Sequence, residues 1–594
     1  MKVTNELTND KGGLFITKET DFNEVFTPED FLEEHHMIAK TTKDFVEKEV
    51  ISLGEAAKTL NYDLTRKILK KAGDVGLLGA SLPEEYGGLG LDGVRFALMK
   101  ESLNVHTSSL TMTIGGQVGI GALPIVFFGT SEQREKYLPG LVSGSLATAF
   151  ALTEPSSGTD ASGIKTSAKL SDDGQSYILN GNKVFITNAG FADIFVVFAK
   201  VNGTDFSAFI VERESKGLTI GPEEKKMGLK ASSTCSISFE DVQVPASNLL
   251  GKIGKGHLIA FNVLNFGRLS VGANCLGTTK EALTVSCKYA NQRIQFGKKI
   301  SSFPLIAQKL ADINIKTFVL ESMVYRTANL FDAGLSQLDF GNPDLGEISR
   351  KAISEYMLEC AINKVFGSET LDFAADEGLQ IHGGYGYMQE YIIEEIYRDS
   401  RIKRIFEGTN EINRLFITNT ITSRIAKGQL NQLQESLDVT LPEIAEEISE
   451  SSSLNNSAQL VQFSRKLYAY TLDKVMDYYG EQLKQEQEIS SNLADMIIQL
   501  YAMDSALLRT KKIIKKQGEH KAVLAVQITN TFINESFEIL ARFAKRSLMA
   551  VVNGQELTND LSTIDNWLRK FLINTVPVKR RIADSVINKE GYTY

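Results

Sequence analysis

The sequence has few cysteines and histidines and only one tryptophan, and these shortages exclude several kinds of site. The four cysteines lie far apart without a CxxC pair, and the six histidines show no metal-ligand spacing. We therefore expect neither a disulfide framework nor a bound metal, which fits a reducing compartment. The cysteines are Cys235, Cys275, Cys287 and Cys360.

Basic blocks and long apolar runs are missing as well. The net charge is −9 and the sequence pI is about 5.5, so no nucleic acid is expected as a partner. Residues 1–20 contain no apolar core after a basic run, and no uninterrupted apolar window of about 18 residues occurs elsewhere. We expect a cytoplasmic protein.

The 594 residues are too many for one hydrophobic core, so several domains are expected. Helical periodicity, with a start signal at Thr130-Ser131-Glu132-Gln133, is followed by strand signals and then by helical periodicity again. Residues 1–25 are polar, and we expect them to be loosely ordered. The predicted fold class is α+β, mostly α, with a helical domain over 26–148, a β domain over 149–255, a helical domain over 256–427, a polar linker over 429–456 and an additional helical domain over 457–594.

Within the β domain, β-branched and aromatic residues predict five short strands. An Asn180-Gly181 dipeptide between the first two strands predicts a hairpin turn. No helix-length segment separates the strands, so the sheet should be antiparallel or mixed and not doubly wound. The strands are expected at 176–179, 183–186, 194–200, 207–211 and 234–239.

One apolar stripe at helical spacing marks the additional helical domain, and this spacing favours core packing. A membrane-surface helix is the alternative, although it requires a strongly basic face and tryptophan anchors, so peripheral membrane contact stays open. The stripe consists of Leu493, Met496, Ile497, Leu500 and Tyr501.

The stretch from Arg404 to Asn410 reads RIFEGTN and sets one carboxylate, Glu407, between an apolar pair and a flexible turn. Desolvation by the apolar pair would raise the pKa of this carboxyl and make it a better proton acceptor. Gly408 would let the backbone approach a ligand, and Thr409 with the residue after it predicts a helix cap. The pattern suits chemistry on an acidifiable C–H bond, and a solvent-facing capping turn is the alternative.

Four further stretches offer groups that suit contact with a ligand. Residues 150–160 (FALTEPSSGTD) offer hydroxyls and backbone amides that suit phosphates or a polar ring. Phe185 and Thr187 would project to one side of a strand, which suits a flavin. Arg293 supplies a fixed positive charge, and residues 380–386 (QIHGGYG) a glycine turn. A face of small residues would let another helix or a ligand approach closely: Gly267, Ser270, Gly272 and Ala273.

In combination and in this order, these stretches resemble the acyl-CoA dehydrogenase family over about residues 30–425. The motifs are Leu-Thr-Glu-Pro with Gly-x-Asp, Phe-Ile-Thr-Asn, Arg-x-x-Phe-Gly, Gln-Ile-x-Gly-Gly-x-Gly and Glu-Gly-Thr-Asn. The helices after residue 430 resemble the extension of the very-long-chain branch. The resemblance implies a helical domain, a β domain and a four-helix-bundle domain, followed by the additional helical domain.

The resemblance implies FAD-dependent α,β-dehydrogenation of a fatty acyl-CoA thioester to trans-2-enoyl-CoA, the first step of fatty acid β-oxidation. Glu407 would take the α-proton, and its backbone N–H would hold the thioester carbonyl. Some branches place the base on the helix that here holds residues 265–268, but no acidic residue lies between Phe261 and Gly277. The implied substrate-binding residues are Thr159, Asn265, Arg268 and Gly408.

The same resemblance assigns the residues that bind FAD. Phe185 would stack on the isoalloxazine, where many relatives have tryptophan, and Thr187 would bond near its N5. A second group would contact the ADP half of an FAD bound mainly by the neighbouring subunit, which implies a homodimer: Arg293, Phe296, Gln380, Gly383 and Gly384. The remaining cofactor-binding residues are Phe150, Ala151, Leu152, Thr153, Thr159, Ile186, Thr409, Asn410 and Glu411.

The implied electron acceptor is electron-transfer flavoprotein. Two alternatives stay open: an acyl-CoA oxidase whose flavin is reoxidised by oxygen, and a scaffold or assembly protein on the same fold. Ser109 and Thr111 stand about where glycines widen the acyl cavity in the very-long-chain branch, so the acyl length is open between medium and very long. Whether dimers pair into tetramers is open as well.

Overall fold

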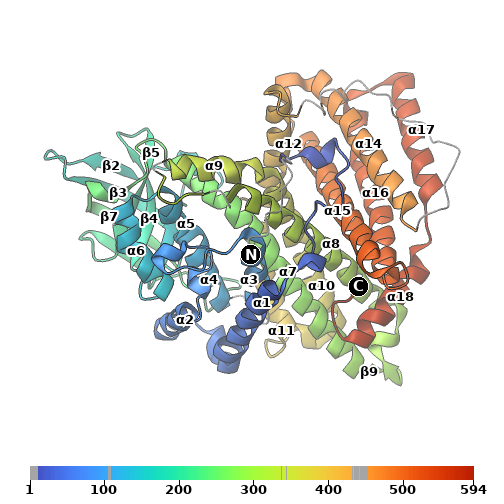
Figure 1. Ribbon diagram of the computed structural model, residues 1–594, viewed down its shortest axis with the longest axis horizontal. Helices are drawn as coiled ribbons and strands as arrows, with labels where there is room; N and C mark the ends of the chain where they lie inside the picture. The colour runs from blue at the N-terminus through green and yellow to red at the C-terminus, as the bar shows by residue number, and fades with distance from the viewer. Residues whose placement is uncertain are drawn as a thin grey trace.

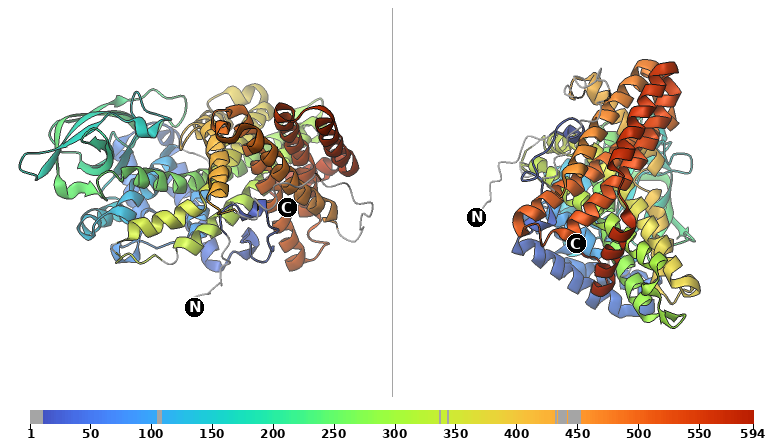
Figure 2. Two further views of the ribbon diagram at one scale, coloured as in Figure 1. Left: turned by 90° about the horizontal axis from the view of Figure 1, so that it is seen from above. Right: turned by 90° about the vertical axis from the view of Figure 1, so that its right-hand side faces the viewer.

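The computed structural model describes residues 11–104, 109–335, 338–342, 344–430, 433, 441 and 453–594, and the protein is elongated (Figure 1). The strands of the β domain lie at one end and the last helices of the chain at the other. Three long helices lie between them: α7 (Gly256–Gln292), α8 (Pro304–Leu335) and α10 (Met357–His382). The view from above in Figure 2 shows the same order of parts.

Short helices form the N-terminal part of the protein. The predicted start signal is confirmed, because the Thr130 hydroxyl accepts from the Gln133 N–H at 3.2 Å and the Gln133 side chain accepts from the Thr130 N–H at 3.0 Å. This capping box opens α6. The helices are α1 (Glu33–Phe45), α2 (Tyr62–Asp74), α3 (Gly93–Leu103), α4 (Ser109–Gly116), α5 (Leu123–Phe128) and α6 (Ser131–Ser143).

The prediction that the first 25 residues are loosely ordered is wrong for their described part, residues 11–25. Phe15 is buried, and its carbonyl accepts from the Arg465 guanidinium at 2.9 Å. The Gly13 N–H donates to the Glu359 carboxylate at 2.7 Å. These partners come from distant parts of the chain, so the composition of the segment does not reveal them.

The β domain is one mixed sheet of eight strands, all within the described residues. They are β1 (Thr148–Ala151), β2 (Ser167–Leu170), β3 (Ser176–Thr187), β4 (Ile194–Val201), β5 (Asp205–Glu212), β6 (Leu218–Glu223), β7 (Thr234–Pro245) and β8 (Leu249–Leu250). The order is β6-β7-β3-β2-β4-β5-β8, with β1 paired to β4. Strands β1 and β2 run parallel to β4, and the other pairs are antiparallel, which confirms the predicted sheet type.

The predicted hairpin turn at Asn180-Gly181 is wrong. Strand β3 runs through both residues and pairs with β2 on one side and β7 on the other, with a register shift against β7 between Leu179 and Gly181. Gly181 is required at this irregularity, because its φ is +150° and a Cβ there would lie 2.5 Å from the Thr166 hydroxyl. Pairing on both edges therefore overrides the local turn preference.

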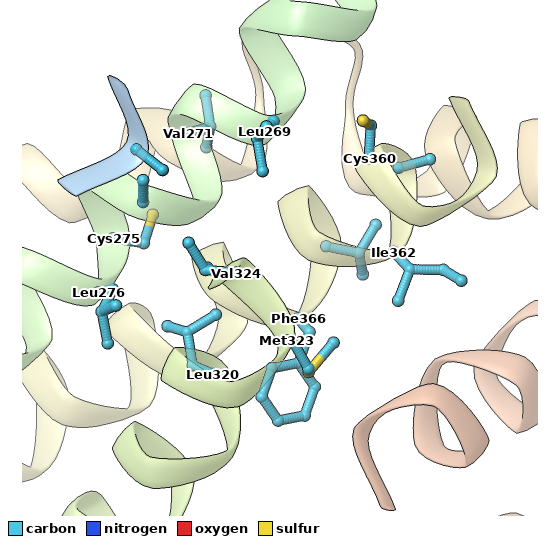
Figure 3. Packing of buried hydrophobic residues seen from close by; sticks show 14 of the residues in the cluster. Leu269, Val271, Cys275, Leu276, Leu320, Met323, Val324, Cys360, Ile362 and Phe366 are labelled. Atoms are coloured by element: carbon cyan, nitrogen blue, oxygen red, sulfur yellow. The ribbon is translucent and has the colours of Figure 1, made fainter. Parts of the chain in front are cut away.

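Helices α7, α8 and α10 pack against one another in the third part of the protein. Figure 3 shows the apolar side chains that fill the space between them. Small residues permit the approach, because a Cβ added to Gly272 of α7 would lie only 3.3 Å from the Asn363 Cβ of α10. The other helices of this part are α9 (Leu345–Glu355), α11 (Ile392–Ser400) and α12 (Asn410–Ala426).

The additional helical domain, which we call the extension, packs against α8 and α12. Its predicted apolar stripe at 493–501 is buried, which confirms core packing and keeps the stripe away from any membrane. Trp567 also lies here, stacked on Phe463 with ring centroids 4.0 Å apart. The helices are α14 (Asn455–Tyr479), α15 (Gln487–Gln517), α16 (Val523–Val551), α17 (Gly554–Phe571) and α18 (Thr575–Lys589). Of the predicted linker, positions 431, 432, 434–440 and 442–452 lie outside the described residues.

Five charged residues, which we call the core–extension network, join the extension to the rest of the protein; the Lys280 side chain is half-buried and the other four side chains are buried. Arg509 of α15 contacts Glu29 at 3.0 Å and Glu321 of α8 at 2.7 Å. Lys280 of α7 contacts Glu321 as well, and Glu101 of α3 at 2.6 Å. Burial acts to raise the pKa of Glu321, but Lys280 and Arg509 bring it below its ordinary value. The network is therefore paired throughout.

Among the described residues, Ser109–Phe128 is an apolar stretch with the length and composition of a membrane span. It covers α4, a π-helical turn with a kink at Gly119, and α5. Because 78% of its most apolar window is buried inside the protein, its composition reflects core packing.

Candidate active site

Glu407 lies in the turn that leads into α12. Glu407 and Gly408 have φ values of +54° and +81°, so two successive residues are left-handed. The Thr409 hydroxyl then accepts from the Ile412 N–H at 3.3 Å, which confirms the predicted helix cap. A non-glycine residue in this conformation is uncommon, and strained positions of this kind cluster at functional sites.

Three side chains hold this turn by its carbonyl groups. The Asn413 amide donates to the Glu407 and Gly408 carbonyls at 3.4 and 2.8 Å. The Lys364 ammonium of α10 donates to the Gly408 carbonyl at 2.7 Å, and the Arg268 guanidinium of α7 donates to the Glu407 carbonyl at 3.4 Å. By contrast, no group in the described ranges accepts a hydrogen bond from the Glu407 N–H. This N–H can therefore serve a ligand.

One oxygen of the Glu407 carboxyl is enclosed. This Oε2 atom is buried and finds no hydrogen-bond partner in the part of the chain that the structure describes. Gly267 of α7 gives it room, since a Cβ there would lie 2.9 Å from Oε2. Burial raises the pKa of Glu407 to about 7, against the opposing charges of Arg268, Lys364 and Lys100. The carboxyl is therefore desolvated, as the sequence predicts, although Ile405 of the apolar pair is itself 47% exposed.

Of the four predicted substrate-binding residues, three lie together around Glu407. Arg268 is buried, and its guanidinium donates to the Asn265 side-chain oxygen at 3.0 Å. It also lies over the Phe416 ring, 4.5 Å from the ring centre. Gly408 is part of the turn itself, whereas Thr159 lies in an exposed loop of the β domain.

A buried ion pair fixes the loop after β1, which carries several predicted cofactor-binding residues. Lys183 of β3 contacts Glu154 at 2.8 Å and donates to the Leu152 carbonyl at 3.1 Å. Burial lowers the pKa of Lys183 to about 8, although Glu154 opposes the change. The pair holds the loop against β3. Of the predicted residues, Phe150 and Ala151 end strand β1 and are half-buried and buried, whereas in the loop Leu152 is buried, Thr153 half-buried and Thr159 exposed.

The predicted flavin platform on β3 lies at a bulge and not on a regular strand. The register against β7 shifts between Lys183 and Ile186, and Phe185 has a φ of +59°. Phe185 is 65% exposed, Ile186 is buried and Thr187 is half-buried. An exposed aromatic face with a hydroxyl nearby fits a planar and partly polar ring system such as the isoalloxazine.

The second group of predicted cofactor-binding residues lies at a distance from the first. The Arg293 guanidinium lies over a tyrosine ring of the glycine turn after α10, 5.4 Å from its centre. Phe296 is 92% exposed, Gln380 is exposed, and a Cβ at Gly383 or Gly384 would meet no atom within 4 Å. Figure 1 places this region, around β9 (Ile294–Gln295), far from β3. One chain therefore does not bring the two groups together.

Two of the three predicted cofactor-binding residues at the start of α12 already form hydrogen bonds within the protein. Thr409 is the helix cap, and the buried Asn410 accepts from the Lys364 ammonium at 2.6 Å through its side-chain oxygen. Glu411 alone is exposed. The helix N-terminus remains a favourable place for a phosphate.

The sequence analysis does not predict three buried lysines near Glu407: Lys100 of α3, Lys364 of α10 and Lys403 just before the turn. Fully buried lysines are rare. Lys100 lies in a helix whose residues are all buried except Arg95, and a lysine directly after the apolar run 96–99 is the one signal that the sequence offers.

Four family models match successive parts of the chain. They are described as acyl-CoA dehydrogenase N-terminal domain over residues 32–145, middle domain over 149–242 and C-terminal domain over 254–422, with a second C-terminal domain model over 465–566. The family that the motifs indicate is confirmed, and the extension matches a family domain of its own.

Individual proteins agree with these models. A probable acyl-CoA dehydrogenase of Bacillus subtilis is 46% identical over 589 residues, 98% of each chain. The mitochondrial very long-chain specific acyl-CoA dehydrogenase of Macaca fascicularis is 37% identical over 494 residues, 78% of this chain and 72% of that protein. A crystal structure of an acyl-CoA dehydrogenase complexed with FAD from Bacillus anthracis matches with a TM-score of 0.94 and 48% identity, over 98% of this chain and 100% of that one. The predicted fold class is confirmed.

Proposed function

The protein belongs to the acyl-CoA dehydrogenase family and takes FAD as its cofactor, and on this premise we propose that it oxidises fatty acyl-CoA thioesters with Glu407 as the base. The observation that carries the proposal is the Glu407 turn, with a buried and unpartnered carboxyl oxygen beside a backbone N–H that lacks an acceptor among the described residues. A carboxyl with a pKa of about 7 is well matched to proton abstraction near neutral pH.

Glu407 would act on the thioester through two groups. Its backbone N–H would donate to the thioester carbonyl, where negative charge develops as the α-carbon loses its proton. Its carboxylate would accept that proton. Because Asn413 and Lys364 hold the carbonyls of this turn, the N–H stays aimed without rearrangement during the reaction.

When bound, FAD supplies the acceptor for the hydrogen that leaves the β-carbon. The residues present fit this cofactor: Phe185 offers an aromatic face, Thr187 a hydroxyl, and the loop held by the Lys183–Glu154 pair offers backbone groups. The product would be the trans-2-enoyl-CoA, from acyl chains of medium to very long length.

We propose a homodimer in which Arg293, Phe296, Gln380 and the Gly383-Gly384 turn serve the FAD of the neighbouring subunit. The distance between these exposed residues and Phe185 within one chain supports this arrangement. Light scattering should give a dimer or a multiple of it. Arg293→Glu should lower the FAD content of purified protein, and an unchanged FAD content would contradict this role.

The activity is tested by anaerobic mixing with acyl-CoA substrates from butyryl-CoA to palmitoyl-CoA, followed by flavin absorbance. Bleaching of the flavin by one or more chain lengths is the expected result, and the fastest length defines the preference. A flavin that stays oxidised with every substrate would contradict the proposal.

Electron-transfer flavoprotein is the proposed acceptor, and oxygen is the competing one. After anaerobic reduction by palmitoyl-CoA, the flavin should stay reduced on exposure to oxygen and should reoxidise when electron-transfer flavoprotein is added. Reoxidation by oxygen within milliseconds would identify an oxidase.

A further inference from the structure

Two buried lysines near Glu407 have fewer partners than buried charges require. Lys403 is 0% exposed, and its ammonium finds no hydrogen-bond partner within the described ranges. Lys100 is 1% exposed, and its ammonium donates to the Gly115 carbonyl at 3.0 Å. Each ammonium has three donors, so most of this donor capacity is unused. An uncompensated buried charge is strongly destabilising, and its retention calls for an explanation.

Packing contacts place Lys100 beside the reacting group. Its ammonium lies 5.0 Å from the centre of the Phe96 ring, and Phe96 packs on Phe266 with centroids 4.9 Å apart. The residue after Phe266 is Gly267, which lies against the Glu407 carboxyl. The charge of Glu407 accordingly acts on the pKa of Lys100, which burial lowers to about 7.

Lys403 is four positions before Glu407 in the sequence, and its charge acts on Lys100. Its ammonium is 5.6 Å from the centre of the Phe406 ring. The charge of Asp399 acts on Lys403, but the oxygens of Asp399 accept from the Leu229 N–H at 2.6 Å and the Ser109 hydroxyl at 3.5 Å. Asp399 is therefore not a hydrogen-bonded counter-ion for this lysine.

The cations near Glu407 divide into two that hold the turn and two that have no carboxylate partner among the described residues. Lys364 and Arg268 are hydrogen bonded to the carbonyls of the turn. Lys100 and Lys403 have no carboxylate hydrogen bonded to them within the described ranges. A hydrocarbon chain reaching this place from a thioester at Glu407 would leave both ammonium groups unpaired, whereas a carboxylate would pair with both.

We propose that Lys100 and Lys403 form a carboxylate-binding subsite, and that the enzyme accepts acyl-CoA substrates whose acyl chain ends in a second carboxylate. This inference rests on the proposed function, because it requires the thioester to bind at Glu407. The two lysines then determine specificity by binding the terminal carboxylate of the acyl chain, while Glu407 performs the proton transfer.

The test compares matched substrates of equal chain length, from adipoyl-CoA with hexanoyl-CoA to hexadecanedioyl-CoA with palmitoyl-CoA. The holoenzyme is mixed anaerobically with each, and the flavin reduction rate divided by the dissociation constant gives an efficiency. The ratio of the two efficiencies should peak at one chain length. At that length Lys100→Met and Lys403→Met should each lower the ratio by about tenfold or more, the value of one charged hydrogen bond.

Matched variants separate specificity from folding. Lys100→Arg keeps the charge and should keep most of the ratio, and Lys427→Met, at an exposed lysine after α12, should leave it unchanged. If a methionine variant loses FAD, Lys100→Gln and Lys403→Gln carry the same test.

Three outcomes would decide against these ideas in different ways. A ratio that neither lysine variant changes would overturn the subsite. An equal slowing of both substrate classes would also overturn it, because the lysines would then act on the chemistry at Glu407. If no substrate of either class bleaches the wild-type flavin, the proposed function itself fails.

Discussion

Helix α3 carries two neighbouring residues that belong to two different groups of buried charges. Glu101 is part of the core–extension network, where it contacts Lys280 at 2.6 Å. Lys100 belongs to the charges around Glu407, where a carboxyl oxygen and the Lys403 ammonium have no hydrogen-bond partner in the described part of the chain. Charges of the same types are thus ion-paired in the core–extension network and lack ion-pair partners around Glu407.

The two groups also shift their carboxyl pKa values in opposite directions. Burial acts to raise the pKa of both glutamates, but Lys280 and Arg509 bring Glu321 below its ordinary value, while Glu407 rises to about 7. Burial is therefore shared, and the completeness of pairing is what differs. Complete pairing holds two parts of the protein together, whereas incomplete pairing leaves groups ready to react or bind.

Glu407→Gln should give the largest effect in either group. The amide keeps the shape of the side chain but cannot accept the α-proton, so flavin reduction by acyl-CoA should slow by about a thousandfold or more. Anaerobic stopped-flow absorbance measures this rate, and an unchanged FAD content shows that the site is intact. A variant with full activity would refute Glu407 as the base.

Arg509→Met should destabilise the protein most within the core–extension network. It leaves Glu29 and Glu321 buried with one partner fewer, a loss of about 3–5 kcal/mol in the free energy of unfolding. Denaturant unfolding followed by circular dichroism measures this loss.

The matched control is Lys511→Met on the same helix. Lys511 forms a partly exposed pair with Glu19 at 3.2 Å, which should contribute less than about 1 kcal/mol. Equal losses for both variants would contradict the distinction between buried and surface pairs.

The pH dependence should separate the two groups. Glu407 is active when deprotonated, so flavin reduction measured at low substrate concentration should rise tenfold per pH unit below about 7 and level off above it. Stopped-flow rates between pH 5 and 9 test this, and a flat profile would contradict the assignment. Because the folded pKa of Glu407 is raised, its contribution to the free energy of unfolding is fully present below the ordinary glutamate pKa. This contribution is lost as pH rises through about 7.

The network should respond in the opposite pH window. Because the folded pKa of Glu321 is lowered, its contribution to stability is present above the ordinary glutamate pKa of about 4.3 and is lost as pH falls below it. Acid unfolding of wild type and Glu321→Gln should differ in this range, and identical acid unfolding curves would contradict the pairing.

The smallest expected effect is that of Gly267→Ala. A methyl group there would come within 2.9 Å of the Glu407 carboxyl and turn it aside, which should slow flavin reduction by about tenfold. Gly272→Ala, on the same helix but against Asn363, should lower the unfolding midpoint without changing the rate. If both variants leave the rate unchanged, the carboxyl has more freedom than the packing indicates.

Local signals in the sequence predict the elements that short-range chemistry determines. The capping box at Thr130, the cap at Thr409 and the buried stripe at 493–501 depend on residues three or four positions apart, and all three are confirmed. Asn180-Gly181 fails as a turn, because strands on both sides pair through it. The segment 11–25 is ordered by partners from the far side of the chain.

The sequence likewise predicts the part of the candidate site that is local in the chain and not the residues that other elements contribute. Glu407 is apparent because its apolar neighbours and Gly408 are adjacent in sequence. Lys100 and Lys364 come from other helices, and the buried Lys183–Glu154 pair joins a strand to a loop, so no local pattern indicates them. The separation of the two predicted FAD-binding groups within one chain is likewise a property of the fold.

The only tryptophan of the chain, Trp567, stacks on Phe463 inside the extension. Its intrinsic fluorescence therefore reports on the extension alone, while the visible colour of the flavin would report on the region around Phe185, the flavin platform that we propose. A heating experiment read at both wavelengths would show whether these two ends melt together or in sequence, without any added label.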